Sequence, residues 1–316
     1  MAVSLQRCAT YDPADLEPAL DALLAPLGGL GAFVAAGQNV LLKPNLISDS
    51  SPERAATTHP ALLAALARRC LDLGARPCIA DAPAWGGPLR VARATGVQDV
   101  CDRLGIPFVH LNARTRVPSC RPAVATGFHV DPRVLAADVV INVPKLKAHQ
   151  QVGFTGAAKN LFGCMAGREK AWHHCAQSRT DLVFARYLAA LAGSLPVALH
   201  VMDGVLAMEG MGPRLGTPRA LGVLAASADA VELDTVCAEL LTAPASHRLL
   251  QRAARELGLG ETDPARIALH GTPLAELAVA DFLWPELVGV FFSPVRLARG
   301  WWRNKQLLAA ERRGAG

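Results

Sequence analysis

One apolar run and the cationic segment after it constrain this chain more than any other feature. Residues 139–143 are apolar except for Asn142, which is typical of a strand buried on both faces of a sheet, and Pro144 ends the run. Residues 145–175 then contain four lysines and three histidines but one carboxylate, Glu169. A buried ammonium costs several kcal/mol unless an opposite charge pairs with it. Any buried lysine of this segment therefore needs a partner of opposite charge, either an acidic side chain that is distant in the sequence or a bound anion.

The rest of the chain alternates predicted strands with predicted helices. The strands are expected at 39–42, 77–80, 107–111, 139–143, 197–202, 220–225 and 267–269, and the helices at 15–27, 61–73, 91–94, 97–104, 181–191, 229–241 and 246–257. This alternation predicts an α/β fold with a mostly parallel sheet flanked by helices on both faces, in one domain or two lobes. The α/β domain is expected to span residues 1–275, and an apolar and then basic tail to span residues 276–316.

Several predicted strands run directly into a charged residue. These residues are Lys43, Asp81, Lys145 and Asp203. Ligands of open α/β sheets bind beyond the carboxyl ends of the strands, so the four side chains are expected to meet at one edge of the sheet. The alternative is that each charge only solvates its own loop. For Lys145 and Lys159, a structural ion pair with Asp81 or Asp203 is the competing interpretation.

Other polar residues near these strand ends are candidates for binding a small anion or for moving protons. The further ligand-binding candidates are Asn45, Thr58, His59, Lys147 and Asn160, and the catalytic candidates are His149, Lys159, His173, His174 and Glu209. Lys159 and Asn160 follow two glycines, and backbone N–H groups there are expected to cradle a phosphate or carboxylate. Thr57 or Thr58 is expected to cap the next helix, and the Thr58 hydroxyl to hold an anion. Glu209 adjoins a glycine-rich loop and is the expected unpaired general base.

Composition excludes several classes of protein. The eight cysteines include no C-x-x-C pair, so no built-in iron–sulfur cluster and no zinc ribbon are expected, and any other cofactor stays unknown. His149, Cys164, Cys175 and the pair His173-His174 match no standard metal-ligand spacing, and no metal site is expected. Without a signal peptide or a membrane span, the expected location is the cytoplasm.

The net charge of +5 is concentrated at one end of the chain. Six basic residues and one acid follow Phe292, so residues 1–292 are neutral. A nucleic-acid-binding protein would need a basic face on its body, and no nucleic-acid partner is expected.

Seven segments together resemble the domain of unknown function 362 family. They are VLLKPNL (40–46), ATTHP (56–60), DVVINVPKLKAH (138–149), TGAAKNLFG (155–163), GREKAWHH (167–174), MDGVLAMEGMGPRLG (202–216) and the helix start at 229–234. The resemblance covers roughly residues 36–245 and implies no settled reaction. Many relatives carry a ferredoxin-like segment with clustered cysteines, which this chain lacks. A weaker likeness is to the nickel-pincer lactate racemases, in which His149, Gly156 and Lys159 would match a histidine, a glycine-rich turn and a cofactor-tethering lysine.

These features favour an enzyme that acts on a small carboxylate or phosphate molecule. Lysines would anchor the anion, while His149 and one of His173 or His174 would move protons, most readily in an isomerase-like abstraction beside a carbonyl. Two other classes stay open. The chain could be a redox protein that works with a separate electron carrier, or a binding module without catalysis.

The tail from residue 282 to the C-terminus combines an apolar run with a basic segment. As a helix, residues from Val295 onward would place Leu297, Trp301 and Leu308 on one face and most basic residues around the other sides. Such a helix suits peripheral contact with a membrane surface. The alternative is that the apolar run packs on the domain or on a second subunit of a homo-oligomer.

Overall fold

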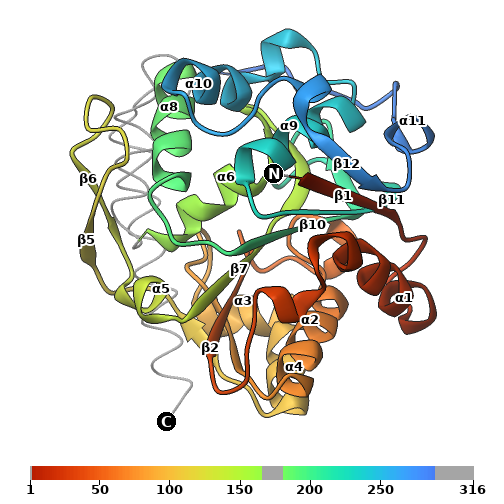
Figure 1. The fold of residues 1–316 in the computed structure, drawn as a ribbon, viewed down its shortest axis with the longest axis vertical. Coiled ribbons are helices and arrows are strands. Elements are labelled where there is room, and N and C mark those ends of the chain that lie inside the picture. Colours follow the sequence, from red (N-terminus) through yellow and green to blue (C-terminus); the bar gives the residue numbers. More distant parts are fainter. Residues whose placement is uncertain (1, 166–180, 289–316) are drawn as a thin grey trace.

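A ten-stranded sheet forms the centre of the molecule (Figure 1). The structure is a computed structural model and describes residues 2–165 and 181–288. Its strands are β1 (Ala2–Arg7), β2 (Asn39–Pro44), β3 (Arg76–Asp81), β4 (Phe108–His110), β7 (Val139–Val143), β8 (Lys145–His149), β9 (Gly153–Thr155), β10 (Leu199–Glu209), β11 (Thr217–Ser227) and β12 (Ala268–Gly271). They lie in the order β12-β1-β11-β10-β7-β2-β3-β4, with β8 pairing with β10 and with β9.

The prediction of an α/β fold with a mostly parallel sheet is confirmed. Strand β7 is parallel to β2 and β10, and β2–β3, β3–β4, β8–β10 and β1–β12 are also parallel pairs. The antiparallel pairs are β1–β11, β10–β11 and β8–β9. Because neighbouring parallel strands point the same way, the carboxyl ends of β2, β3, β7 and β10 share one edge of the sheet.

Helices cover both faces of this sheet. The described helices are α1 (Pro13–Leu24), α2 (Pro60–Asp72), α3 (Pro88–Ala94), α4 (Val97–Leu104), α5 (Pro132–Ala136), α6 (Ala157–Asn160), α8 (Asp181–Ala192), α9 (Ala230–Leu240), α10 (Leu249–Leu257) and α11 (Leu274–Leu277). Alternate residues of a strand face opposite sides, so Leu41 packs into the core shared with α8, α9 and α10, while Val40 and Leu42 pack with α1, α2 and α4. None of the helices in the described part of the chain is long and apolar enough to cross a membrane.

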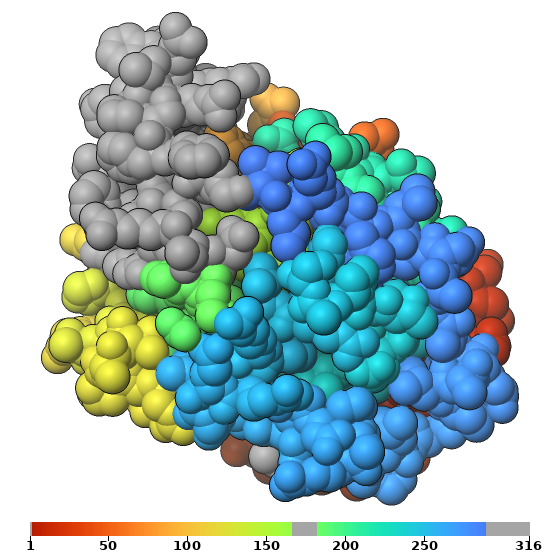
Figure 2. Space-filling view, turned by 90° about the horizontal axis from the view of Figure 1, so that it is seen from above, coloured from red at the N-terminus to blue at the C-terminus, as the bar shows by residue number. Residues whose placement is uncertain are grey.

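Residues 112–131, which carry no clear sequence pattern, contain a separate hairpin. Strands β5 (Thr115–Pro118) and β6 (Gly127–Val130) pair antiparallel outside the main sheet. Figure 2 shows this yellow hairpin on the face where green α8 lies beside blue α10. Phe128 at its base is buried against Tyr187 of α8 with 5.1 Å between the ring centroids, so the hairpin belongs to the same core.

Several local expectations are wrong. No strand was expected at Ala2–Arg7, yet β1 lies inside the sheet because β11 and β12, which are distant in sequence, pair with its two edges. No strand was expected in the segment after Pro144 either, but it forms β8 and β9. The period-two alternation KLKAH carried this signal, since Leu146 and Ala148 face the apolar core.

Candidate functional site

Two buried ion pairs stand at the shared strand edge. Lys43 at the end of β2 lies 2.7 Å from Asp81 at the end of β3, and Lys145 of β8 lies 3.0 Å from Asp203 of β10. Both lysines and Asp203 are fully buried, and Asp81 is 3% exposed. The prediction that these four side chains meet at one edge is confirmed. Lys145 also forms the structural ion pair that the competing interpretation predicted, because its partner is the side chain of Asp203. Gly163 closes over the first pair, since a Cβ there would lie 2.5 Å from Lys43 Nζ.

Asp203 accepts hydrogen bonds from three donors at its two carboxylate oxygens. Tyr11 donates its hydroxyl proton to Oδ1 at 2.6 Å, and Lys145 donates to Oδ2 at 3.0 Å and to the Tyr11 hydroxyl at 2.8 Å. The backbone N–H of His59 donates to Oδ2 at 2.8 Å, and the His59 ring stacks on Tyr11 at 3.6 Å. Burial lowers the pKa of His59 to about 4, so the ring is neutral near pH 7. Sequence reasoning missed Tyr11, because nothing in its neighbourhood indicates a partner 192 residues away.

Lys147 is a buried cation without a carboxylate partner among the described residues. Its ammonium donates to Asn45 Oδ1 at 2.9 Å and to the carbonyl oxygen of Ala56. Burial, followed by the charges of Lys159 and Lys145, lowers the pKa of Lys147 well below its ordinary value. The side chain therefore holds its proton weakly, and a nearby anion would strengthen its charged form.

Lys159 of α6 lies in the same electrostatic neighbourhood. Its ammonium stands 5.3 Å from the centre of the Phe162 ring and 5.9 Å from that of Phe184. Within the described part of the chain it forms no ion pair, so the structural pairing with Asp81 or Asp203 is not observed. Burial and the charge of Lys43 lower its pKa to about 8. Aromatic faces stabilise a cation less than a carboxylate does, which leaves this charge incompletely neutralised.

Three asparagines and a histidine form a hydrogen-bonded chain that begins at Lys147. Asn45 Oδ1 accepts from Lys147, and Asn45 Nδ2 donates to Asn160 Oδ1 at 3.0 Å. Asn160 Nδ2 donates to Asn142 Oδ1 at 2.7 Å, and Asn142 Nδ2 lies 2.9 Å from Nδ1 of His200. The chain explains the single polar residue in the apolar run of β7, and it holds Asn45 and Asn160 in fixed orientations.

The backbone N–H groups at the start of α6, which were expected to bind an anion, already bind an acidic side chain of the protein. The backbone N–H groups of Ala157 and Ala158 donate to the two oxygens of Asp234 in α9, at 2.5 and 3.0 Å. A Cβ on Gly156 would lie 2.0 Å from Asp234 Oδ1, so glycine is required for this contact. Lys159 itself lies inside the helix. These two backbone N–H groups are therefore not free for a phosphate.

The helix start at Thr58 also differs from expectation. The N-cap of α2 is His59, whose Nδ1 accepts from the backbone of Ala61 at 3.2 Å, and neither threonine is the cap. The Thr58 hydroxyl donates to the carbonyl oxygen of Val143 at 2.7 Å and accepts from the backbone of Asn45 at 2.8 Å. Both hydroxyl interactions are internal, so Thr58 positions Asn45 against the end of β7.

Glu209 is neither in a loop nor unpaired. It is the last residue of β10, is 5% exposed, accepts from the backbone of Leu283 at 3.1 Å and lies 3.8 Å from Arg219. His149 ends the neighbouring strand β8, and its Nδ1 accepts from the backbone of Gln151 at 3.1 Å. Glu209 therefore has two structural partners that its sequence neighbourhood did not indicate.

The remaining candidates, His173 and His174, lie outside the described residues, as does Cys175. The roles assigned to them stay predictions. Within residues 2–165 and 181–288, no group of three histidine, cysteine or acidic side chains is placed to hold a metal ion.

Three comparisons with known proteins show what this chain is similar to. The model of a "domain of unknown function (DUF362)" matches residues 40–239. The thylakoid-associated protein sll1697 of Synechocystis sp. is 35% identical over 303 residues, which cover 96% of this chain and 94% of that protein. The structure of the lactate racemase apoprotein from Thermoanaerobacterium thermosaccharolyticum matches with a TM-score of 0.45 and 14% identity, over 69% of this chain and 54% of that one. This chain thus spans about half the length of that racemase.

Proposed function

Because the chain belongs to the DUF362 family, whose domain has no described function, we propose its activity from the site itself: an enzyme that acts on a small molecule carrying a carboxylate or phosphate group. One observation carries the proposal. Lys43, Lys145, Lys147 and Lys159 surround two carboxylates, so the cluster holds two more cationic groups than anionic groups when all are ionised. Buried charges need compensation, and an anionic ligand would supply it.

The partly exposed members of the cluster mark where such a ligand would enter. Lys43, Lys145 and Lys147 are fully buried, whereas Asn45, His59 and Lys159 are partly exposed. We expect an anion bound beside these partly exposed residues to accept hydrogen bonds from Lys159 and Asn45 and to compensate the charge of Lys147. Lys43 and Lys145 already have carboxylate partners, so their proposed role is to stabilise the structure around the site.

Proton transfer is the chemistry that these groups suit best. An amine with a pKa of about 8 can accept and release a proton near neutral pH, and Lys159 has such a value. His149 at the end of β8 is the second proton carrier of the proposal. Glu209 receives no proton-transfer role, because Leu283 and Arg219 hold its carboxylate. The reaction would be abstraction of a proton beside a carbonyl, as in an isomerisation.

Anion binding tests the proposal first. Acetate and inorganic phosphate should raise the melting temperature of the native protein, since a ligand that binds only the folded state stabilises it. Lys159→Met should abolish this shift with little loss of stability, whereas Arg252→Met, on an exposed residue of α10 that pairs with Glu256, should leave it unchanged. An unchanged shift in Lys159→Met would refute the assignment of the anion site.

Deuterium exchange then separates an enzyme from a binding module. The protein is incubated in D2O with small 2-hydroxy and 2-oxo acids, and NMR measures loss of the proton beside the carboxyl or carbonyl carbon. Exchange that disappears in Lys159→Met is expected of the enzyme. Binding without exchange of any acid would favour the non-catalytic module. A visible absorbance band of the purified protein would favour the redox alternative.

A second proposal concerns location: the chain associates peripherally with a membrane through its tail. The relative from Synechocystis sp. is named as thylakoid-associated, and residues 293–316 here carry six basic residues and two tryptophans, which favour an anionic lipid surface. Flotation with vesicles containing anionic lipid should recover the full chain and lose the chain without residues 293–316. Equal flotation of both chains, or of neither, would refute a role for the tail.

A further inference from the structure

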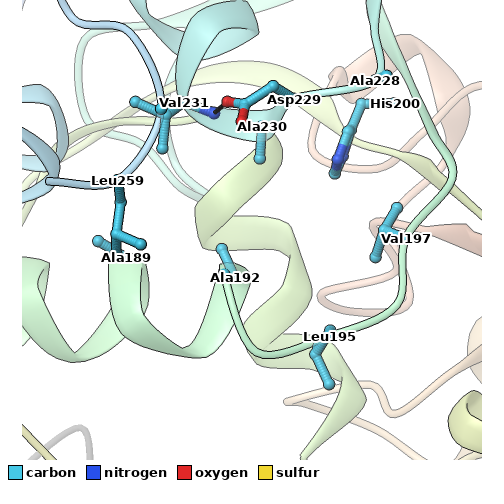
Figure 3. A pocket seen from close by; sticks show the side chains of 12 residues that line it. Ala189, Ala192, Leu195, Val197, His200, Ala228, Asp229, Ala230, Val231 and Leu259 are labelled. Carbon is cyan, nitrogen blue, oxygen red and sulfur yellow. Dashed lines mark hydrogen bonds between the residues drawn. The ribbon is translucent and has the colours of Figure 1, made fainter. Parts of the chain in front are cut away.

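A cavity lies beside His200, at the end of the asparagine chain opposite Lys147. Its volume is about 180 Å³, and it opens between the end of α8, the start of α9 and the segment that leads into β10 (Figure 3). Most of the lining residues have apolar side chains, among them Ala192, Leu195, Val197, Ala230 and Leu259, and the side chain of His200 points into the space. A cavity of about 150 Å³ holds a benzene molecule, so this one has room for a ligand of roughly six to nine heavy atoms.

The hydrogen bonds of the asparagine chain determine which nitrogen of His200 carries the proton. Asn160 Nδ2 must be the amide nitrogen, because it faces the carbonyl oxygens of Lys43 and Pro44 at 3.2 and 3.3 Å. Its second proton goes to Asn142 Oδ1, and Asn142 Nδ2 donates to the carbonyl oxygen of Ala157 at 2.9 Å. Asn142 Nδ2 is therefore the donor toward His200, and Nδ1 of the histidine accepts. In a neutral ring the proton then resides on Nε2.

His200 therefore presents one N–H donor to a cavity lined mostly by residues with apolar side chains. Burial lowers its pKa to about 3, which keeps the ring neutral at physiological pH. His200 is 3% exposed, and within the described residues Nε2 makes no hydrogen bond. An unused donor in a cavity large enough for several heavy atoms points to a ligand that brings an acceptor.

The charges around the cavity disfavour an anionic ligand. Asp229, the one charged residue of the lining, accepts from the backbone N–H groups of Val231 and Glu232 at the start of α9. The start of that helix is thus already capped by a carboxylate, and a second anion would meet like charge. A cation could approach Asp229, but it would leave the Nε2–H donor of His200 without an acceptor. These contacts leave an uncharged ligand as the chemistry that matches the cavity.

We propose that this cavity is a binding site for a small uncharged molecule with an apolar body and one hydrogen-bond acceptor, such as a ketone, an aldehyde or an ester, held by Nε2–H of His200. The site is separate from the lysine cluster, so its test does not depend on the function proposed above. Lys147 lies at the other end of the asparagine chain, beyond three amide side chains.

A matched pair of probes tests the hydrogen bond. Cyclopentanone and methylenecyclopentane have the same size and shape, but only the ketone offers an acceptor. Titration of protein with ¹⁵N-labelled histidine should show saturable shifts of the His200 ring nitrogens. The ketone should bind roughly five- to tenfold more tightly than the hydrocarbon, as one hydrogen bond to a buried neutral donor allows.

Two variants and a control complete the test. Ala192→Leu fills the cavity and leaves the His200 hydrogen bond to Asn142 intact, so it should abolish binding of both probes, while Ala94→Leu on the exposed side of α3 should change neither. His200→Phe should remove the preference for the ketone. Equal affinity for the two probes, non-saturable shifts, or unchanged binding in Ala192→Leu would each overturn the proposal and assign the cavity to water alone.

Discussion

The ammonium of Lys145 lies 3.0 Å from the carboxylate of Asp203, and both side chains are fully buried. The Tyr11 hydroxyl bridges them by accepting from the lysine and donating to the aspartate. With the backbone N–H of His59 as a further donor, Asp203 joins the N-terminal segment, the start of α2 and two strands. The pair therefore links elements that are distant in sequence at the edge of the sheet where the proposed anion would bind.

Removing Lys145 should destabilise the protein strongly. In Lys145→Met, Asp203 loses its ion-pair partner while remaining buried, and such a change costs about 3–5 kcal/mol. Urea denaturation measures the effect. The control is Arg186→Met, which breaks an exposed pair with Glu256 and should cost less than about 1 kcal/mol. A similar small loss for both variants would mean that the buried pair has no special role in stability.

Anion binding should weaken as the pH rises through about 8. The pKa of Lys159 is lowered to about 8, so its charged form prevails below that pH and disappears above it. If only the ammonium binds acetate, the affinity falls about tenfold per pH unit on the alkaline side. Calorimetry of acetate binding between pH 6 and 10 checks this. An affinity that stays level across pH 8 would exclude Lys159 as the anchoring cation.

Lys159 should also make stability depend on pH, with a defined sign. Its pKa is about 8 in the folded protein against an ordinary value of 10.5, so the unfolded chain binds more protons between these values. The stability cost of charging Lys159 is therefore fully present below pH 8 and is relieved as the pH rises toward 10.5. Lys159→Met lacks this cost. Its advantage in unfolding free energy over the native protein should therefore shrink as the pH rises from 8 to 10.5. A difference that grows instead would contradict the lowered pKa.

Gly156 should tolerate no side chain. A Cβ at this position would lie 2.0 Å from Asp234 Oδ1 and would displace the carboxylate from the backbone of Ala157 and Ala158. Gly156→Ala should therefore lower the free energy of unfolding by about 2–4 kcal/mol, through overpacking and lost hydrogen bonds. Gly31→Ala is the matched control, because the nearest atom to its Cβ would be 3.9 Å away. Thermal unfolding of both variants distinguishes a specific clash from the general cost of replacing glycine.

Much of the secondary structure was predictable because its signals are local. The bounds of β7 and α4 match the expected ranges, since an apolar run ended by Pro144 and a helix ended by Gly105 are visible in neighbouring residues. β10 was expected to end at residue 202 but continues to Glu209, because β11 pairs with its extension. The extension also buries Glu209 beside Arg219, which no pattern near that residue indicates.

The positions of charged residues after the strands and of a cationic segment after β7 follow from the order of residues alone. That order also determined that the sheet is mostly parallel, because alternating strand and helix patterns leave little other choice. Which charges neutralise each other depends instead on the three-dimensional packing of the chain. Asp203 pairs with Lys145 across 58 residues, and Asp234 rather than a ligand occupies the start of α6 across 77 residues. Such contacts leave no local pattern, because burial selects a partner by its position in space, and position depends on the packing of the whole sheet.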